Sequence, residues 1–424
     1  MIFPPVPKLP LGNPILGKAL LCNDLSMDHR FLSWPFFDDF HRTFGRDFGQ
    51  WAASELAQYE DNEGGDGKAA RDIFQRLGIG KWLDYSIPGS PGSRGDKHDL
   101  RTLCLMREIL GYRATIADVA FSEPWLAIMP VALFGSEQVK RELLPGYLRG
   151  EMLPAFALSE PGAGSDAAAL ETKAQLDGDH YVICGRKMWT SNSGLADVYV
   201  VFARTGEGPE THGISAFLVD GRLPGISLEE RLAVLPPHTV GTLHFNNVRV
   251  PADQLLGQPG QGFKIAMTVL ELFRPTVGAA TLGMARRAMD EAVTRSKARV
   301  AFKKPICEHQ LIQAKLADMA VKVDASALLV YRASWTHDVG ESRLTREAAI
   351  AKLYATEAAQ EVVDQALQIF GGLGVMKGMV VERLYRHVRA FRIFDGTSEI
   401  QKLIIARDLL REHEFMHRDA NENH

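Results

Sequence analysis

The sequence predicts a mostly helical α+β protein in which a central antiparallel β domain separates two helical regions. Two observations carry this prediction. Apolar residues recur with a helical period across residues 34–150 and 260–411, whereas short alternating runs occupy residues 153–250. The 424-residue chain therefore divides into an extended arm (1–28), an N-terminal helical domain (29–152), a central β domain (153–260), a C-terminal helical bundle (261–412) and a polar tail (413–424).

The first helical region has one clear amphipathic segment, residues 40–59. Within it Phe40, Phe44, Phe48 and Trp51 lie near one face of a helix, and Leu56 follows on the same side. Helical patterns also cover residues 106–121 and 136–150. Clusters of Gly and Pro in residues 78–95 interrupt the region, so we expect several helices instead of one.

The middle region contains a hairpin signal in residues 173–190, KAQLDGDHYVICGRKMWT, which predicts a strand, a tight turn at DGD and a second strand. Further strands are predicted over 197–204, 214–220 and 241–250, where β-branched and aromatic residues gather. The spacing of the turns between them is typical of an antiparallel sheet or barrel.

The last region predicts three helices of more than 20 residues each, over 277–300, 309–335 and 346–370. Their many alanines allow helices to approach closely. Helices of this length in one region indicate a helical bundle.

Composition excludes several classes of protein. A net charge of −4 provides no basic surface for nucleic acid or an anionic membrane. The four cysteines are far apart and form no CxxC pair, which argues against disulfides and cysteine-bound zinc and favours a reducing compartment. Five prolines interrupt the apolar N-terminus, so no signal peptide is predicted, and no run of 18 apolar residues predicts a membrane span. We expect a cytoplasmic protein.

Nucleotide and metal motifs are weak or absent. No P-loop occurs, and the third glycine of a GxGxxG fingerprint is replaced by Ala167. The tail segment HEFMH places His413 and His417 four residues apart with Glu414 between them, the spacing of zinc proteases. It lies near the chain end in polar sequence without room for a supporting fold, so we interpret it as a solvated tail and predict no metal site.

Residues 158–166, LSEPGAGSD, have the composition of a ligand-binding loop at the entry to the β domain. Gly162 and Gly164 would let backbone amides approach a flat or anionic ligand, and Ser159 and Ser165 add hydroxyl donors. A plain turn is the alternative interpretation.

Residues 187–194, KMWTSNSG, combine the aromatic face of Trp189 with the hydroxyls of Thr190 and Ser191 in a strand-like stretch. Taken alone, this pattern favours a buried core tryptophan beside ordinary strand hydroxyls.

Two further segments fall at expected helix ends. KARVAFKKPICEHQ, residues 297–310, contains a cation, an aromatic ring and two polar groups, namely Arg299, Phe302, His309 and Gln310. QIFGGLGV, residues 368–375, places glycines after a long helix, where a C-terminal capping turn is the simple explanation.

Residues 391–401, FRIFDGTSEIQ, raise a choice between two roles for Asp395. It could cap the following helix, or it could be a base that removes a proton. A carboxylate bonded to helix amides would be less basic, so the two roles are compatible only in part.

Together and in this order, these segments resemble the acyl-CoA dehydrogenase family over residues 34–411. The motifs that carry the resemblance are SEPGAGSD, KMWTSN, FNNVRVPADQLLG, RVAFKKPICEHQ, QIFGGLG and DGTSEIQ. The resemblance implies an N-terminal helical domain, a central β domain and a C-terminal four-helix bundle. It also implies one FAD per subunit between the β domain and the bundle, in a homotetramer built as a dimer of dimers, or in a dimer.

The resemblance also assigns cofactor contacts to matching positions. Trp189 would stack on the flavin and Ser191 would hydrogen-bond near its N5 atom. The other contacts within one subunit would be Phe156, Leu158, Ser159, Gly164, Ser165, Thr397 and Glu399. Contacts to the FAD of a neighbouring subunit would be Arg299, Phe302, His309, Gln310, Gln368, Gly371 and Gly372. Arg299 suits this role because a guanidinium pairs well with a pyrophosphate.

The catalytic position departs from the family pattern, since Asp395 stands where relatives usually have Glu. A minority of relatives carry the base just before an arginine in the first long helix of the bundle, but that position is Phe273, followed by Arg274. Asp395 is thus the expected base. Asp is one methylene shorter, and a misplacement of ~1 Å can cost on the order of 100-fold in rate. That loss is small against the ~10⁶-fold or greater acceleration that enzymes provide.

The activity implied is dehydrogenation of an acyl-CoA to its trans-2-enoyl-CoA, with hydride passing to flavin N5 and electrons then to an electron-transfer flavoprotein. Substrate contacts would come from Ser165, Phe273, Arg274, Phe394 and Gly396. Bulky Phe121, Pro124, Trp125 and Phe273 favour a short, branched or cyclic acyl group.

The sequence leaves two other functions open. One is a flavin oxidase on the same fold, similar to nitroalkane oxidase, which also uses an Asp base. The other is a non-enzymatic relative that binds DNA, which the net charge of −4 disfavours.

Overall fold

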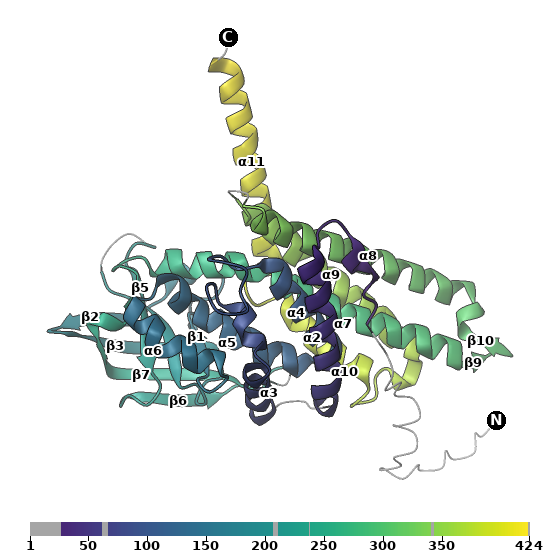
Figure 1. Cartoon of the computed structure of the whole chain (residues 1–424), viewed down its shortest axis with the longest axis horizontal. Helices are drawn as coiled ribbons and strands as arrows, with labels where there is room; N and C mark the ends of the chain where they lie inside the picture. The colour runs from purple at the N-terminus through teal and green to yellow at the C-terminus, as the bar shows by residue number, and fades with distance from the viewer. Residues whose placement is uncertain (1–26, 62–66, 207–210, 237, 341–342, 423–424) are drawn as a thin grey trace.

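A computed structural model of the chain describes residues 27–61, 67–206, 211–236, 238–340 and 343–422 (Figure 1). The expected N-terminal arm lies outside the described residues except for Met27 and Asp28. Figure 1 shows a β sheet at one end of an elongated helical body, with the C-terminal helix projecting from it.

The N-terminal region is helical, as predicted. Its elements are η1 (Arg30–Ser33), α2 (Asp39–Glu55), η2 (Ala57–Tyr59), α3 (Lys68–Ile79), η3 (Trp82–Ser86), α4 (Leu100–Arg113), α5 (Thr115–Phe134) and α6 (Glu137–Leu148). The aromatic face of α2 is confirmed, because Phe44 and Phe48 are buried and their rings stack at 5.6 Å. The Gly- and Pro-rich segment separates α3 from α4, also as predicted.

The helical pattern over residues 106–121 is confirmed, but it belongs to two helices instead of one. The chain breaks between α4 and α5 at Ala114, whose backbone is extended at φ −151°. Both helices lie against α7 (Gly262–Ala298), and α5 also lies against the first strand of the sheet.

The β domain contains β1 (Pro154–Ala157), β2 (Lys173–Asp177), β3 (His180–Ser191), β4 (Val198–Arg204), β5 (Ile214–Asp220), β6 (Ile226–Arg231), β7 (Val240–Pro251) and β8 (Leu255–Leu256). The sheet order is β6-β7-β3-β2-β4-β5-β8, with β1 beside β4. The predicted hairpin is confirmed as β2 and β3, joined at Gly178 and Asp179. Most pairs are antiparallel, but β1 and β2 each run parallel to β4.

The C-terminal region is a bundle of long helices, as predicted. It contains α7, the short hairpin β9 (Val300–Ala301) and β10 (Lys304–Pro305), η6 (Ile306–Glu308), α8 (Gln310–Asp338), α9 (Thr345–Phe370), η7 (Gly371–Leu373), α10 (Val380–Phe391) and α11 (Ser398–Glu422). Helix α11 continues across the expected boundary at 412/413, so the backbone of the polar tail is helical to Glu422. The side chain of His417 lies outside the described residues.

Small residues let the helices approach closely. A Cβ atom on Gly283 of α7 would lie 1.9 Å from the carbonyl oxygen of Glu108 in α4. A Cβ atom on Gly278 would lie 3.2 Å from the carbonyl oxygen of Ala351 in α9. Larger side chains at these positions would separate α7 from both neighbours.

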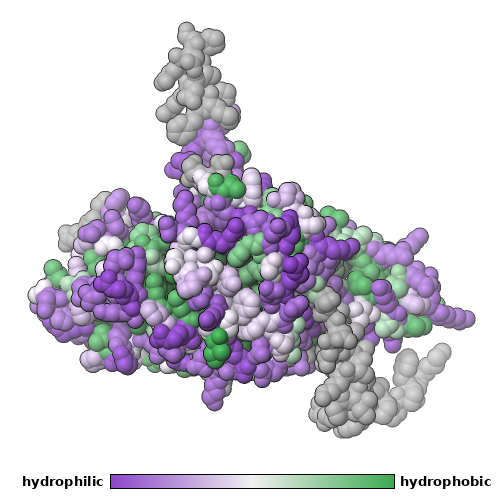
Figure 2. Space-filling model, viewed as in Figure 1, coloured by the Kyte–Doolittle hydropathy of each residue, from purple (hydrophilic) through white to green (hydrophobic). Residues whose placement is uncertain are grey.

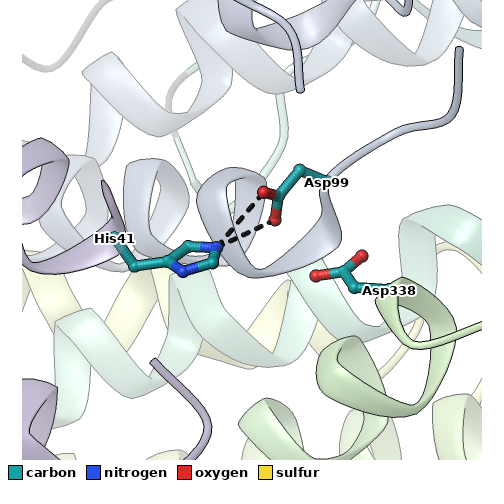
Figure 3. A group of neighbouring side chains, drawn as sticks. All are labelled: His41, Asp99 and Asp338. Atoms are coloured by element: carbon teal, nitrogen blue, oxygen red, sulfur yellow. Dashed lines mark hydrogen bonds and ion pairs between the residues drawn. The ribbon is translucent and has the colours of Figure 1, made fainter. Parts of the chain in front are cut away.

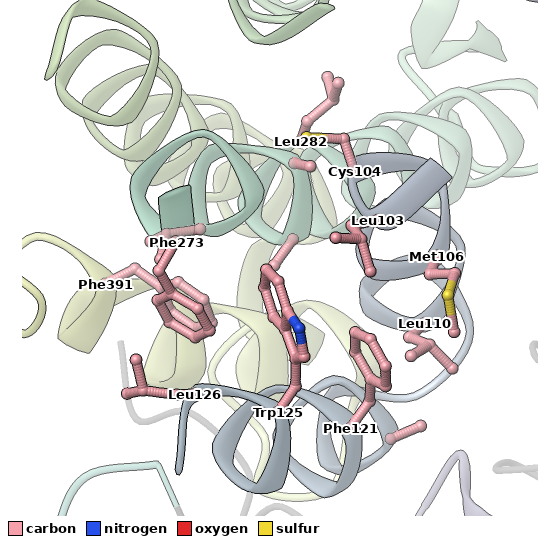
Figure 4. Close-up of a cluster of buried hydrophobic side chains, with 14 of the residues drawn as sticks. Leu103, Cys104, Met106, Leu110, Phe121, Trp125, Leu126, Phe273, Leu282 and Phe391 are labelled. Atoms are coloured by element: carbon pink, nitrogen blue, oxygen red, sulfur yellow. The ribbon is translucent and has the colours of Figure 1, made fainter. Parts of the chain in front are cut away.

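One large hydrophobic core joins the N-terminal helices to the bundle, and a second lies within the β domain. Figure 4 shows part of the larger core, where Phe121 and Trp125 of α5 meet Phe273 of α7. Two helices, α5 and α7, are long and apolar enough to cross a membrane by length and composition. However, 78% and 72% of their most apolar windows are buried inside the protein. On the face visible in Figure 2, hydrophobic and hydrophilic residues of the described surface are interspersed.

Candidate functional site

Asp395 lies in a tight turn between α10 and α11. Its backbone is left-handed at φ +55°, and Gly396 follows at φ +89°. The carbonyl oxygen of Gly396 accepts hydrogen bonds from Lys352 Nζ at 2.8 Å and from Gln401 Nε2 at 2.9 Å. These bonds fix the turn against α9 and α11.

Asp395 does not cap α11, so the capping alternative is wrong. Helix α11 begins at Ser398, and the hydroxyl of Thr397 accepts the hydrogen bond from the Ile400 amide at 3.3 Å. Within the described part of the chain, no hydrogen bond to the Asp395 carboxylate is present. This carboxylate therefore remains available to accept a proton.

The surroundings of Asp395 raise its pKa to about 7. Burial is the largest cause, and the nearby carboxylate of Glu123 adds to it, while Lys352, Arg107 and Arg274 oppose it. A carboxylate with a pKa near neutral pH is suited to act as a general base.

Arg107 and Arg274 bring positive charge close to Asp395 from different helices. Arg107 is committed to Asp118, since its Nε and Nη2 atoms donate to both carboxylate oxygens at 2.8 Å. Arg274 on α7 is buried, and its Nε has no hydrogen-bond partner among the described residues. Burial lowers the pKa of Arg274. An unpaired, buried N–H calls for an acceptor, which fits the expected role of Arg274 in holding a ligand.

The aromatic residues near the site form a packed wall. Phe273 is fully buried against Trp125, with ring centroids 5.3 Å apart (Figure 4). The Arg107 guanidinium lies 4.7 Å from the centre of the Phe273 ring. Phe394 is partly exposed and packs on Phe391 with a centroid distance of 4.7 Å. Phe273 therefore belongs to the buried packing that supports Arg107.

The loop at residues 158–166 is anchored to β3 by a buried ion pair. Glu160 accepts from Lys187 Nζ at 2.7 Å and from the amides of Glu171 and Thr172 at 2.6 and 3.0 Å. The Met188 amide also donates to the Ser159 carbonyl at 2.9 Å. These contacts hold the loop beside the strand segment that carries Trp189.

The rest of this loop leaves space for a ligand. A Cβ atom on Gly162 or Gly164 would meet nothing within 4 Å, and Ser165 is exposed. Leu158 and Ser159 are partly exposed, while Phe156 on β1 packs on Phe202 at 4.9 Å. If this loop were a plain turn, the open space beside Gly162 and Gly164 would have no function.

Trp189 is not a core residue, which overturns the interpretation favoured by the pattern alone. A bulge interrupts the pairing of β3 with β7 between Lys187 and Thr190. Trp189 adopts φ +62° in this bulge, and 54% of its surface is exposed. The neighbouring Thr190 hydroxyl is buried without a partner among the described residues. An exposed indole, an open glycine loop and an unpaired hydroxyl together fit a flat, anionic dinucleotide such as FAD.

The residues expected to reach a second FAD lie elsewhere. Phe302 is 91% exposed in the β9–β10 turn, Arg299 and Gln310 flank it on the surface, and His309 contacts its ring at 5.9 Å. Figure 1 shows this hairpin at the end of the bundle opposite the sheet. One chain therefore does not bring the hairpin and Trp189 together.

The remaining expected contacts are at helix ends. Gln368, Gly371 and Gly372 are exposed where α9 ends, and Gly371 has φ +64° with ψ −139°, which lies outside the left-handed region of a C-terminal capping glycine. Glu399 is exposed in the first turn of α11.

Three charged residues of the site were missed by the sequence analysis: Arg107, Glu123 and Lys352. Each stands in an apolar or alanine-rich helix. Arg107 and Lys352 are buried and Glu123 is partly exposed, and this burial of charged groups is the signal that reveals them. That signal exists only in the folded chain.

A separate cluster of His41, Asp99 and Asp338 has the ligand types of a metal site (Figure 3). Its carboxylates are already paired: Arg94 contacts Asp99 at 3.2 Å and Arg101 contacts Asp338 at 2.7 Å. The positive charges of Arg94 and Arg101 disfavour the binding of a metal cation at this cluster. The cluster instead joins α2, α4 and α8.

Comparison with known proteins supports the resemblance along the whole described body. Profiles of the acyl-CoA dehydrogenase N-terminal, middle and C-terminal domains match residues 38–151, 155–248 and 260–410. The rat mitochondrial short-chain specific acyl-CoA dehydrogenase is 43% identical over 415 residues, covering 93% of this chain and 96% of its own. Cyclohexane-1-carbonyl-CoA dehydrogenase of Geobacter metallireducens is 41% identical over 286 residues, covering 67% and 74%.

Among solved structures, a chain in the structure of the electron transferring flavoprotein of Acidaminococcus fermentans has a TM-score of 0.83 at 32% identity. The match covers 91% of this chain and 100% of that chain.

Proposed function

The chain belongs to the acyl-CoA dehydrogenase family of FAD-dependent oxidoreductases, and from this premise we propose that Asp395 is the base that takes the α-proton of an acyl-CoA thioester. The observation that carries the proposal is the state of the Asp395 carboxylate. It is not used in helix capping, and its pKa is raised to about 7. At and above neutral pH it can therefore accept a proton.

The product is the trans-2-enoyl-CoA thioester. FAD, when bound, supplies the acceptor for the hydride that leaves the β-carbon. Asp395 receives the α-proton on a carboxylate oxygen, and Lys352 and Arg274 favour the ionised form of Asp395 that is needed before this transfer. Trp189 and Ser191 on β3, with the 158–166 loop, would hold the flavin.

We propose a short or cyclic acyl group as the substrate. Phe121, Trp125 and Phe273 are fully buried and pack on one another, and we expect them to restrict the depth of the acyl site. The relatives named short-chain specific and cyclohexane-1-carbonyl-CoA dehydrogenases agree with this size class. The match to a chain in an electron transferring flavoprotein structure supports such a flavoprotein as the electron acceptor.

The proposal also includes a homo-oligomer, a tetramer or a dimer. Phe302 and Arg299 are exposed at the end of the bundle opposite the sheet, where they would contact the FAD of a neighbouring subunit.

The decisive experiment mixes the FAD-loaded protein with acyl-CoA esters without oxygen and follows bleaching of the flavin. Butyryl-CoA and cyclohexane-1-carbonyl-CoA should bleach it faster than a long linear ester, and Asp395→Asn should not be bleached at a comparable rate. Bleaching by none of the esters, or equal bleaching of Asp395→Asn, contradicts the proposal. Release of peroxide at full rate in air, with no other acceptor, would instead identify an oxidase.

A further inference from the structure

We infer that Arg295, near the end of α7, is a further cofactor-binding residue, whose guanidinium pairs with the pyrophosphate of the FAD in a neighbouring subunit. The inference rests on the proposed function, which includes a homo-oligomer in which Arg299 reaches that same FAD. A pyrophosphate carries more than one negative charge, so it can accept a second guanidinium beside that of Arg299.

Arg295 and Arg299 are neighbours at the end of α7. They are four residues apart, and the Arg299 amide donates to the Arg295 carbonyl oxygen at 2.9 Å. Within the described parts of the chain, neither guanidinium is paired with a carboxylate. Two like charges at this spacing repel each other. An anion between the two guanidinium groups offsets this repulsion.

Part of the Arg295 guanidinium is shielded from water without a hydrogen-bond partner. The side chain is partly buried, and its Nε is buried with no acceptor among the described residues. Burial lowers the pKa of Arg295, and the positive charge of Arg299 lowers it further. A buried N–H group without an acceptor reduces stability, so this atom calls for a ligand that accepts a hydrogen bond.

Arg295 also lies against the turn that follows α9. Its guanidinium carbon is 5.9 Å from the centre of the Phe370 ring, and Phe370 directly precedes Gly371 and Gly372. A Cβ atom on either glycine would meet nothing within 4 Å, so the backbone of this turn is open to a ligand. Arg295 therefore stands between the two groups of residues expected to reach the neighbouring FAD, Arg299 on α7 and the glycines after α9.

The segment around Arg295 is basic in a chain that is acidic as a whole. Residues 295–304, RSKARVAFKK, contain five cationic side chains and no acidic one, whereas the chain has a net charge of −4. Positive charge concentrated beside an open glycine turn favours an anionic ligand such as a pyrophosphate.

Two structural roles for Arg295 compete with this one. A cation in the last turn of a helix interacts favourably with the helix dipole, and a guanidinium over an aromatic ring forms a cation–π contact. The exposed Lys297 in the same turn already provides the first interaction. Neither role requires a buried Nε without an acceptor, and neither depends on FAD.

The test measures the release of FAD from the FAD-loaded full chain on dilution, by the rise in fluorescence of free flavin. It compares wild type, Arg295→Gln, Arg295→Lys and the matched control Lys297→Gln, which removes an exposed cation from the same helical turn. Arg295→Gln should raise the Kd of FAD roughly 10- to 100-fold, as expected for the loss of a charge-assisted hydrogen bond. Its Kd should also depend less on salt than the Kd of wild type, because the lost contact is ionic.

Arg295→Lys should bind FAD more tightly than Arg295→Gln, since it keeps the charge, and Lys297→Gln should match wild type. An unchanged Kd with unchanged salt dependence in Arg295→Gln overturns the inference, even if the free energy of unfolding falls. Equal weakening in Lys297→Gln also overturns it, because the effect would then not be specific to position 295. If Arg295→Gln does not fold, Arg295→Lys gives the same comparison with a smaller expected rise in Kd.

Mixed oligomers show whether the contact crosses between subunits. When Arg295→Gln and Trp189→Ala chains are produced together, a mixed pair contains one site with both residues intact only if Arg295 serves the FAD of its neighbour. Tight FAD binding should therefore reappear in the mixed protein, and its absence contradicts the inference.

Arg299→Gln and sedimentation separate this inference from the proposed function. If the FAD-loaded protein sediments as a monomer, the proposed oligomer fails and the inference fails with it. If the protein is an oligomer in which Arg299→Gln weakens FAD binding and Arg295→Gln does not, only the inference about Arg295 fails.

Discussion

Lys352 donates a hydrogen bond to the carbonyl oxygen of Gly396 at 2.8 Å, and this bond ties the buried face of α9 to the turn that carries Asp395. Lys352 is fully buried, and burial lowers its pKa to about 8. Its remaining positive charge opposes the effect of Glu123 on Asp395. One residue thus fixes the position of the acidic turn and also favours its ionised state.

Replacing Lys352 with Met should move the acid limb of the pH–rate profile to higher pH, because it removes a positive charge that lowers the pKa of Asp395. The variant also leaves the Gly396 carbonyl with one donor fewer, at a cost of about 1–3 kcal/mol in the free energy of unfolding. The pH dependence of flavin reduction and urea unfolding measure the two effects. Lys377→Met, which removes an exposed lysine, is the control. An unchanged pH profile would show that Lys352 has no influence on the base.

Asp395→Asn should slow flavin reduction by acyl-CoA by roughly 10²–10⁴-fold, the usual contribution of a general base. The amide keeps the size of the side chain but cannot take the proton. Asp395→Glu should retain activity, because the family usually has glutamate at this position. Stopped-flow absorbance gives the rates, and the exposed Asp364→Asn on α9 is the control. Retained activity in Asp395→Asn would exclude this residue as the base.

The wild-type rate of flavin reduction should rise as the pH increases through about 7, because the base must be ionised. The effect on stability has the opposite sign. The folded protein raises the pKa of Asp395 from 3.8 to about 7, so it holds this proton more tightly than the unfolded chain does. Stability from this group is full below about pH 4 and is lost as the pH rises to 7. Asp395→Asn should therefore melt at a higher temperature than wild type above pH 7, and a lower melting temperature there would contradict this pKa.

Thr397→Ala should destabilise the protein by about 1 kcal/mol, since it removes the hydroxyl that caps α11 at the Ile400 amide. Asp395→Gly removes the carboxylate, keeps a residue that tolerates the left-handed backbone, and should not show this loss of a cap. Chemical denaturation of the two variants side by side separates the roles. If Asp395→Gly shows the larger loss, the assignment of the cap is wrong.

The two tryptophans Trp189 and Trp125 should respond differently to replacement by alanine. Trp189 is 54% exposed in the β3 bulge, so Trp189→Ala should reduce the flavin content while leaving apoprotein stability nearly unchanged. Trp125 is fully buried, and Trp125→Ala should cost about 3–5 kcal/mol. Flavin absorbance and urea unfolding of the apoproteins distinguish them. Normal flavin retention in Trp189→Ala would remove this residue from the cofactor site.

Sequence periodicity was sufficient to predict features that depend only on residues close together in the sequence. The hairpin of β2 and β3 was predictable because its strands and its turn are contiguous. The aromatic face of α2 was predictable because helical spacing alone determines it. The break at Ala114 was not, since no glycine or proline stands at this position or directly beside it in the sequence.

The site was predictable only in part. Asp395 stands in a recognisable motif, but Arg107, Glu123 and Lys352 meet it from three different helices. Trp189 was read as a core residue from its pattern because its exposure comes from a bulge, and the bulge depends on the register of β3 with β7. The sequence did not show this register.

The left-handed backbone of Asp395, at φ +55°, has a consequence for protein engineering. Aspartate and asparagine tolerate this conformation better than most residues with a Cβ atom, and glutamate lacks that advantage. Compared with glutamate, aspartate at position 395 therefore has a side chain one methylene shorter, but it causes less conformational strain in the loop. Laboratory evolution that restores glutamate at this position should select compensating changes in the neighbouring loop residues as well as in the substrate pocket.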